Sequence, residues 1–470
     1  MENITSFITY VNDNILYYPV LIVLLLGAGI YFSIRTGLVQ VKLFSESLRV
    51  VNEKPEEGEV SGLQALMVTV GSKVGTGNII GVSTAICLGG YGAVFWMWIV
   101  GLLGAATSFI ESTLAQIYKR RAPEGGCYGG PSYYMEYGLN SKVLGLIFSL
   151  ALILTYGVGF NALASYNLQS SFSVYGFYNE NTPIIIGAIF GILTLYCLLG
   201  GGKRILAFTD KIVPFMGVGY VLVAIIILIM NFSRIPSIFS LIFTDAFNFR
   251  AIFGGIASSS LMFGVKRGLY SNEAGIGSAP NAVASVDTSH PVKQGLVQML
   301  STYIVTFGIC TATAMMTMAS GLEATPDLAG APYVQNALNL MIGNAGNIFI
   351  TASLVLFAFT TIIGNLYYVD SNLTYLNNKK RPSNTFMTVY RIIAAFVVFV
   401  GATMEMDFAW SVSDLLMGIM TIINVPVILR LGGQAIAALN DYIEQKQQGL
   451  DPVFKASNIG IDTSKLDYWK

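Results

Sequence analysis

Glycines and small polar residues gather in one stretch of the chain, where they could bind a solute and an ion. Residues 69–78 read TVGSKVGTGN, with three glycines and with Thr76 and Asn78 beside the last two of them. Each glycine inside a helix costs about 1 kcal/mol of helix propensity, so this stretch is predicted to leave the helical conformation. The oxygens that it would expose are the ligands that a hard cation prefers.

A second stretch, residues 254–264, has a similar composition. It contains two adjacent glycines, three adjacent serines and a Phe-Gly pair. The first stretch is not a nucleotide-binding loop, because residues 75–81 give GxGxxxG rather than GxGxxG and no strand precedes them.

Catalytic and metal chemistry are disfavoured by the residues that would carry them. His290 is the single histidine, and the four cysteines, Cys87, Cys127, Cys197 and Cys310, are scattered without a CxxC pair. A zinc site or a histidine-based triad needs more histidines, or cysteines spaced as metal ligands. We therefore expect a protein that is not an enzyme.

The elements that must position these stretches are transmembrane helices. The 470 residues are 54% hydrophobic and only 11% charged, whereas soluble domains carry about 25% charged residues. The formal net charge is zero, and no basic block is long enough to follow a nucleic acid backbone. The composition predicts an all-α polytopic membrane protein that is surrounded by lipid and does not bind nucleic acid.

Eleven stretches are apolar enough for a transmembrane helix, which needs about 20 residues. They cover residues 15–33, 63–88, 93–117, 143–169, 183–199, 212–230, 251–265, 296–319, 346–370, 389–402 and 408–430. The first is read as a retained helix rather than a signal peptide, because no basic residue precedes it. The long connections at 231–248 and 320–346 are expected to contain interfacial helices.

The basic residues predict the orientation, since lysine and arginine favour the cytoplasmic side of short loops. With the N-terminus outside and the C-terminus cytoplasmic, 23 of the 26 basic residues fall inside, Lys266 and Arg267 among them. Arg234 and Arg250 fall outside, and Lys73 lies within a span. We expect a multi-pass protein of the cell (inner or plasma) membrane.

The two glycine-rich stretches lie about 180 residues apart, each in the first helix of a run of five spans once the leading helix is set aside. Five is an odd number, so the second run is predicted to be inverted relative to the first. Paired broken helices in an inverted repeat are typical of a secondary transporter with its site at the midplane of the membrane. The alternative is that the glycines only allow close helix packing.

Several motifs closely resemble the alanine or glycine:cation symporter family of the amino acid–polyamine–organocation superfamily. They are GTGNIIGV (75–82), GAVFWMW (92–98), FIESTLA (109–115), GGPSYY (129–134) and GVKRGLYSNEAG (264–275). The resemblance covers about residues 15–435. It implies ten core helices in two inverted five-helix repeats and transport of alanine, glycine or related amino acids such as glutamine, driven by sodium or sometimes protons.

The resemblance also implies the site. Gly75, Thr76, Gly77 and Asn78 would contact the substrate at the first break, and Ser258, Ser259 and Phe263 would line the second. Thr360 and Thr361, with carbonyls near Gly71 and Val74, match the sodium site of the wider superfamily.

This sequence departs from the family pattern in two places. Asn365 follows Gly364 where a family alanine carrier has tryptophan, which predicts a larger and more polar substrate pocket. In the third core helix, Asn161, Asn167 and Gln169 stand in an unclear register with the Gln-x-Asn pair of the family.

We therefore expect a sodium-coupled importer of a small neutral amino acid, with sodium as the transported ion. A proton-coupled carrier of the same fold is the nearest alternative, and an ion channel, which would need rings of charge, is a more distant one. Lys73 would face the cytoplasmic vestibule and tune ion release, and Asp414 could serve an external gate. The expected organisation is a peripheral helix and loop (1–61), a first five-helix repeat (62–230), an extracellular connection (231–247), a second repeat (248–436) and a cytoplasmic tail (437–470).

Overall fold

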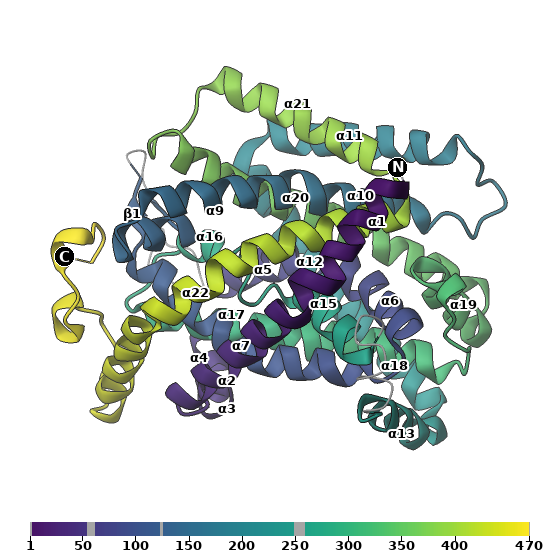
Figure 1. Ribbon diagram of the computed structural model, residues 1–470, viewed down its shortest axis with the longest axis horizontal. Coiled ribbons are helices and arrows are strands. Elements are labelled where there is room, and N and C mark those ends of the chain that lie inside the picture. Colours follow the sequence, from purple (N-terminus) through teal and green to yellow (C-terminus); the bar gives the residue numbers. More distant parts are fainter. Residues whose placement is uncertain (1, 54–61, 123–125, 249–258, 470) are drawn as a thin grey trace.

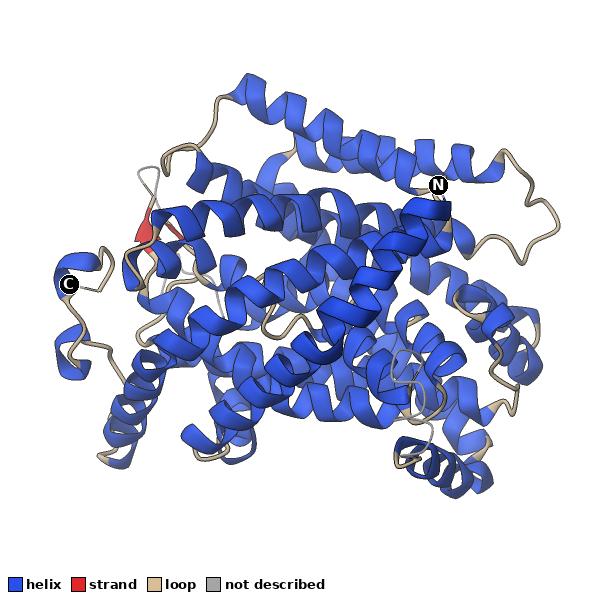
Figure 2. Cartoon of the chain, viewed as in Figure 1, coloured by secondary structure: helices blue, strands red, loops and turns tan. Residues whose placement is uncertain are grey.

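The computed structural model describes residues 2–53, 62–122, 126–248 and 259–469. Nearly all of these residues are helical, as Figure 1 and Figure 2 show. The strands in the described ranges are β1 (Arg120–Arg121) and β2 (Cys127–Tyr128), which pair antiparallel with Arg120 opposite Tyr128. The predicted all-α fold is confirmed.

Nine stretches of helix in the described part of the chain are long and apolar enough to cross a membrane. They are α1 (Glu2–Val11) with η1 (Asn12–Leu21) and α2 (Ile22–Arg35), α7 (Ala93–Ile117), α9 (Lys142–Leu154) with η4 (Thr155–Gly159) and α10 (Phe160–Ser170), α11 (Thr182–Leu199), the Ile212–Met230 part of α12 (Gly201–Met230), α17 (Pro291–Tyr303) with η7 (Ile304–Cys310) and α18 (Thr311–Ala319), α20 (Asn344–Leu376), α21 (Asn384–Gly401) and α22 (Met406–Gln447). Each coincides with one of the eleven predicted spans. The chain is thus a multi-pass membrane protein.

The two predicted spans outside this set are the two predicted to be broken. The first is divided into α5 (Gly62–Lys73), the short turn η2 (Thr76–Asn78) and α6 (Ile80–Gly89). The second contains α15 (Ser260–Asn272), and the chain leaves the helix at Glu273 before the short helix α16 (Pro280–Val283). Helices of ordinary length and composition therefore surround two interrupted ones.

The helices differ in how far they are covered by protein. In the most apolar windows of α11, α12 and α21, 28–39% of the residues are buried, against 72% in the Pro291–Ala319 helix. Figure 1 shows α11 and α21 side by side along one edge of the molecule. We infer that the edge helices face lipid, because their exposed side chains are large and apolar, as at Ile192 and Phe215. The broken helices pack against the buried helices, α7, α17 and α20.

The long connections contain short helices, as expected. Residues 231–248 hold η5 (Phe232–Arg234) and α13 (Ile235–Ala246), and residues 320–346 hold η8 (Pro326–Leu328) and α19 (Ala331–Ile342). At the other end of the bundle, α3 (Val39–Lys42) and α4 (Phe44–Val51) follow the first span.

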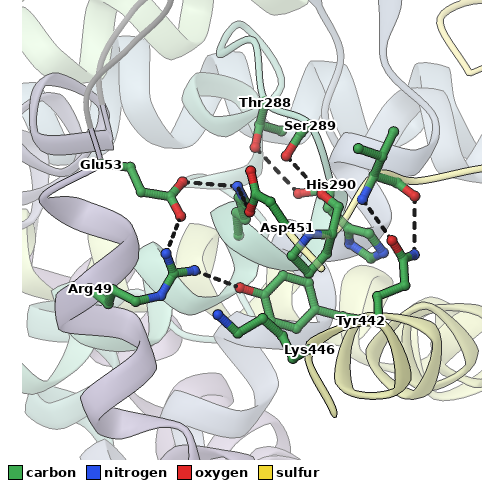
Figure 3. A network of polar contacts seen from close by, with 12 residues as sticks. Arg49, Glu53, Thr288, Ser289, His290, Tyr442, Lys446 and Asp451 are labelled. Atoms are coloured by element: carbon green, nitrogen blue, oxygen red, sulfur yellow. Dashed lines mark hydrogen bonds and ion pairs between the residues drawn. The ribbon is translucent and has the colours of Figure 1, made fainter. Parts of the chain in front are cut away.

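A polar network ties α4, the start of α17, the end of α22 and the C-terminal tail together (Figure 3). Glu53 accepts from Arg49 at 2.7 Å and from Lys293 at 2.9 Å, and Lys293 also lies 3.1 Å from Asp451. The tail continues through η9 (Ala456–Ile459) and η10 (Thr463–Lys465). It ends with the indole of Trp469 donating to the carbonyl of Gln116 on α7.

Candidate functional site

The two helix breaks meet at a small buried cavity of about 10 Å³. Its walls come from the first break, from α10, α15 and α20, and from the start of the second break: Ser72, Lys73, Gly75, Thr76, Gly77, Phe160, Tyr270, Glu273 and Thr361. A cavity of this size holds about one water molecule. In the conformation described, the central cavity is large enough for a small ion but not for an amino acid.

Close contacts explain both glycines of the first break. Gly75 has an extended backbone, and a side chain there would meet the Thr361 hydroxyl on α20 at 2.2 Å. A side chain on Gly77 would meet the ring of Tyr270 on α15 at 2.4 Å. These separations are shorter than van der Waals contact, so only glycine lets the unwound backbone approach α15 and α20. The two glycines therefore allow close helix packing and also lie where the helix unwinds.

Polar side chains hold the first break in place. The Asn78 amide donates to the Lys73 carbonyl at 3.2 Å and accepts from Ser271 at 2.6 Å. The Thr76 hydroxyl accepts from the amide of Asn167 on α10 at 3.0 Å. Both side chains are buried. Asn78 therefore serves mainly to fix the backbone, while Gly75, Thr76 and Gly77 line the cavity.

A break follows α15, later in the chain than the predicted stretch 254–264, part of which lies outside the described residues. Glu273, Gly275 and Gly277 all have positive φ, a conformation that glycine adopts without strain. Glu111 on α7 accepts from the backbone N–H of Gly275 at 3.2 Å. Asn424 on α22 donates to Glu111 and to the Gly275 carbonyl. The buried Glu111 thus fixes the second break, a role that was not predicted for it.

Of the residues predicted at the second break, Ser258 lies outside the described residues. Ser259 caps α15 by accepting from the Met262 N–H at 3.2 Å, and Phe263 lies in the first turns of this helix. Neither residue lines the central cavity. Ser259 has an extended backbone directly before α15, whereas Phe263 lies inside that helix. Their place at a break stays a prediction, because residues 249–258 lie outside the described residues.

Lys73 ends the helix before the first break and interacts electrostatically with a residue of the second. It is the last residue of α5, and its ammonium group donates to the Ser301 hydroxyl on α17 at 2.9 Å. It interacts electrostatically with Glu273 of the second break and with Glu111. All three side chains are buried. The lysine therefore faces two carboxylates inside the protein.

The residues predicted to bind sodium are brought together in part. Thr361 lines the cavity, and its hydroxyl lies 3.4 Å from the Ser72 carbonyl. Thr360, the next residue, donates to carbonyls of its own helix and points toward Met216 on α12. Gly71 lies in the last turn of α5, and Val74 follows that helix directly. Hydroxyl and carbonyl oxygens thus surround the end of α5.

Asn365 lies one turn further along α20 and does not line the cavity. It is buried, donates to Asn161 on α10 at 2.9 Å and accepts weakly from Ser72. Its amide therefore bridges α20 to α10 and to the end of α5. Asn161, one of the three amides noted on α10, is used in this bridge.

A vestibule of about 500 Å³ is lined in part by Arg267, Trp410 and Asp414. Tyr270 packs against Phe160 and Trp410, with ring centroids 4.8 and 5.1 Å apart. Arg267 makes two hydrogen bonds to Asp414, at 3.1 and 2.9 Å, and covers the Trp410 ring. Because Phe160 and Tyr270 line the central cavity and Trp410 lines the vestibule, we infer that this packed group separates the two.

The prediction that Lys266 and Arg267 lie in a cytoplasmic loop is wrong. Both are buried within α15, where Lys266 pairs with Asp13 and Arg267 with Asp414. In the sequence alone, two adjacent basic residues suggest the end of a transmembrane helix. In the structure, carboxylates from distant segments pair with them and offset the free-energy cost of burying their charges.

Comparisons with known proteins give this geometry a context. The family described as "Sodium:alanine symporter family" matches residues 1–456. "Amino-acid carrier protein AlsT" and "Probable sodium/glutamine symporter GlnT" of Bacillus subtilis are each 40% identical, over 97% of this chain and 95% and 94% of theirs. "Sodium/alanine symporter AgcS" of Methanococcus maripaludis is 38% identical, over 93% of this chain and 98% of its own.

The fold also matches a solved structure of low sequence similarity. MhsT, crystallised in complex with L-phenylalanine, superposes with a TM-score of 0.51 at 16% identity, covering 86% of this chain and 96% of that one. At this identity the likeness concerns the fold. The whole-chain matches to the family and to its members show that this chain belongs to the sodium:alanine symporter family and is a membrane transporter, not an enzyme.

Proposed function

We propose that this protein imports a small neutral amino acid, namely alanine, glycine or glutamine, together with sodium, by exposing one central site to the two sides of the membrane in turn. The observation that supports this most directly is the convergence of both helix breaks on one buried cavity. Relatives named as sodium/alanine and sodium/glutamine symporters support the pairing of amino acid and ion.

The proposed places of substrate and sodium follow from the hydrogen-bond donors and the oxygen ligands that the site offers. Backbone N–H groups at Gly75 and Gly77 and the Thr76 hydroxyl would hold the substrate, because freed N–H groups suit a carboxylate. The Thr361 hydroxyl and the carbonyls at the end of α5 would hold sodium, which prefers such oxygens. The cavity must widen for an amino acid to enter, and we assign this to movement of Tyr270.

Residue 365 bears on the choice of substrate. An asparagine here, in place of a bulky aromatic side chain, leaves a polar group between α20 and α10. When the cavity widens, its amide would be available to a substrate side chain. We infer that glutamine is accepted in addition to alanine and glycine.

Sodium supplies the driving force in this proposal. One positive charge crossing a potential of 100 mV releases about 2.3 kcal/mol, which corresponds to more than tenfold accumulation. Because substrate and ion would share the unwound segment 74–79, each would order the backbone that the other contacts.

Proton coupling is the second candidate, and Glu273 is the observation that favours it. Its carboxylate lines the central cavity and accepts from Ser278 at 2.5 Å. A protonated carboxyl at this position could replace the charge of a sodium ion. Two relatives are named as sodium/proton-dependent alanine carriers.

Uptake into proteoliposomes tests the proposal. Purified protein should accumulate labelled alanine or glutamine when sodium is present outside and lose this uptake when choline replaces sodium. Uptake that persists in choline and follows an imposed pH gradient would favour the proton-coupled alternative. Labelling of single cysteines at residue 3 and in the tail with an impermeant reagent tests the proposed orientation, with the N-terminus outside.

A further inference from the structure

The C-terminal tail, residues 451–469, docks on the end of the helix bundle through apolar and aromatic side chains. Phe454, Leu466 and Trp469 are all buried, and the rings of Phe454 and Trp469 lie 5.2 Å apart. Figure 1 shows the tail beside β1. The family match ends at residue 456, so most of the tail lies beyond it. Burial of these side chains stabilises the docked position of the tail.

The tail contacts the end of α7 and the residues that follow it. The Trp469 indole donates to the backbone carbonyl of Gln116 at 2.7 Å. The ammonium group of Lys119, just after α7, lies 3.9 Å from the centre of the Tyr468 ring. A buried hydrogen bond and a cation–π contact thus hold the tail against this helix.

The tail also contacts the loop that precedes α17. The Tyr468 hydroxyl donates to the Asp287 carboxylate at 3.2 Å. The backbone N–H of Phe454 donates to the carbonyl of Ser289 at 2.9 Å. The tail therefore bridges the end of α7 to residues 287–289.

This loop is the end of a connecting segment, residues 274–290, which starts at the second break and contains α16. The Gln116 amide on α7 donates to the carbonyls of Val283 and Val286 at 2.5 and 2.9 Å. From the other side, Asn372 on α20 donates to Asn281 at 2.9 Å. The connecting segment thus joins α7 to α20 and runs from Glu273, in the wall of the central cavity, to the tail.

Two residues at the end of α7 hold both the connecting segment and the tail. Gln116 binds the segment through its side chain and Trp469 through its backbone carbonyl. Lys119 donates to the Val286 carbonyl at 2.8 Å and contacts the Tyr468 ring. If the connecting segment moves away from α7, its bonds to the docked tail are broken as well. The docked tail therefore stabilises the arrangement in which the segment lies on α7.

We propose that the tail is a latch, which holds the central site closed toward the side of the membrane on which the tail lies. In the proposed orientation this is the cytoplasmic side. Release of the tail lets the connecting segment leave α7 and opens that side. The proposal rests on the proposed function, in which one central site is exposed to the two sides in turn, and it adds control of that exposure by the tail.

Point variants of the full-length protein test the latch. Trp469→Ala removes the buried indole, and Val453→Ala is its control, because the Val453 side chain is exposed. Asp467→Lys removes the acceptor of the Arg121 N–H, at 2.8 Å, and repels the basic residues after α7 without changing a buried side chain. Asp462→Lys makes the same charge change at a carboxylate that bonds within the tail.

Two single-cysteine reporters, with the native cysteines replaced by alanine, measure exposure at opposite ends of the protein. Ala282→Cys lies on the connecting segment and is buried. Met406→Cys lies in the vestibule, at the start of α22, whereas the tail follows the end of that helix. The protein is placed in nanodiscs with sodium, so that an impermeant thiol reagent reaches both sides. The labelling rate of each reporter is measured with each tail variant.

We expect Trp469→Ala to speed labelling of the Ala282→Cys reporter at least tenfold and Asp467→Lys about threefold, and both to slow the Met406→Cys reporter. The two control variants should leave both rates unchanged. The slower rate at Met406→Cys separates a shift between two conformations from simple uncovering of the connecting segment. Faster labelling of Ala282→Cys alone would therefore overturn the latch, and so would unchanged rates at both reporters.

A folding check and a transport assay complete the test. Thermal unfolding shows whether each variant is folded, and Asp467→Lys decides the result if Trp469→Ala is not. Labelling needs no transport step. If the reporters respond as expected but wild-type protein shows no sodium-dependent uptake of alanine or glutamine, the latch stands and the proposed function fails. If uptake is present and the reporters do not respond, the latch alone is refuted.

Discussion

Removing the guanidinium group of Arg267 is predicted to destabilise the protein far more than removing the whole ion pair. Arg267 and Asp414 are both about 3% exposed, and they form two hydrogen bonds at 3.1 and 2.9 Å. Breaking a buried pair from one side costs about 3 to 5 kcal/mol, because it leaves the other charge buried. Arg267→Met leaves Asp414 with only Lys266, at 4.0 Å, and Lys266 already binds Asp13. We therefore expect a loss near the lower end of this range.

The double variant Arg267→Met/Asp414→Leu removes both charges and keeps similar volume. Replacing a buried pair by apolar residues is often neutral or stabilising, so we expect it to be more stable than either single variant. Arg234→Met is the control, because Arg234 donates to the single carbonyl of Ala319, and its loss is expected to cost about 1 kcal/mol. Thermal unfolding followed by tryptophan fluorescence ranks the wild type and the four variants under identical conditions.

The result that would refute this reasoning is additivity. If the double variant loses as much stability as the two single variants together, the residues do not act as a pair. A functional readout accompanies the cycle, because the pair closes the central cavity toward the vestibule. A loss of about 3 kcal/mol confined to the closed state shifts its population by about two orders of magnitude. Thr76→Cys should then react faster with an impermeant thiol reagent in the Arg267→Met background.

Three further predictions concern the ion, the charge between the breaks and pH. Thr361→Ala should raise the sodium concentration for half-maximal uptake about tenfold, the equivalent of one hydrogen bond, and Thr360→Ala should change it little; equal effects would contradict the assignment. Lys73→Met leaves two buried carboxylates without their ammonium group, so uptake should fall at least tenfold with altered sodium dependence, and an unchanged rate and sodium dependence would dismiss the role of Lys73. Burial lowers the pKa of His290 to about 4. The unfolded chain therefore takes up a proton on this side chain at a higher pH than the folded chain does. The free energy of unfolding should consequently fall by roughly 3 kcal/mol as the pH drops from 6.5 to 4. His290→Asn keeps an acceptor for the Val292 N–H and should flatten this dependence in a thermal unfolding series; an unchanged slope would assign it to other groups.

The sequence predicts the helices well where hydropathy alone determines them. The predicted span 93–117 matches α7 at both ends. α22 continues from the predicted end at residue 430 to Gln447, because its last turns leave the apolar region and pack against the tail. Such an extension depends on tertiary contacts, which hydropathy does not report. The inverted repeat and the eleven-span count remain predictions.

The two breaks were not equally predictable. The first was located by its glycines. The structure shows why glycine is required there, because Thr361 and Tyr270 occupy the space that a side chain would need. The second was placed at 254–264 on its glycines and serines, whereas the described chain unwinds at Glu273. A signal was present, because Gly275 and Gly277 repeat the Gly-x-Gly spacing of Gly75 and Gly77. It was overlooked because the charged residues before it suggested a loop.

The buried charges give a physical reason for coupling an ion to the closed state. Lys73 ends the helix before the first break, and Glu273 begins the second. With Glu111, their formal charges sum to minus one when all three groups are ionised, and all three side chains are buried. A net charge buried in a membrane is costly, and one sodium ion at the neighbouring Thr361 would neutralise the cluster. Under the proposed function, the closed conformation is therefore most stable with the cation bound, and closing without it is penalised.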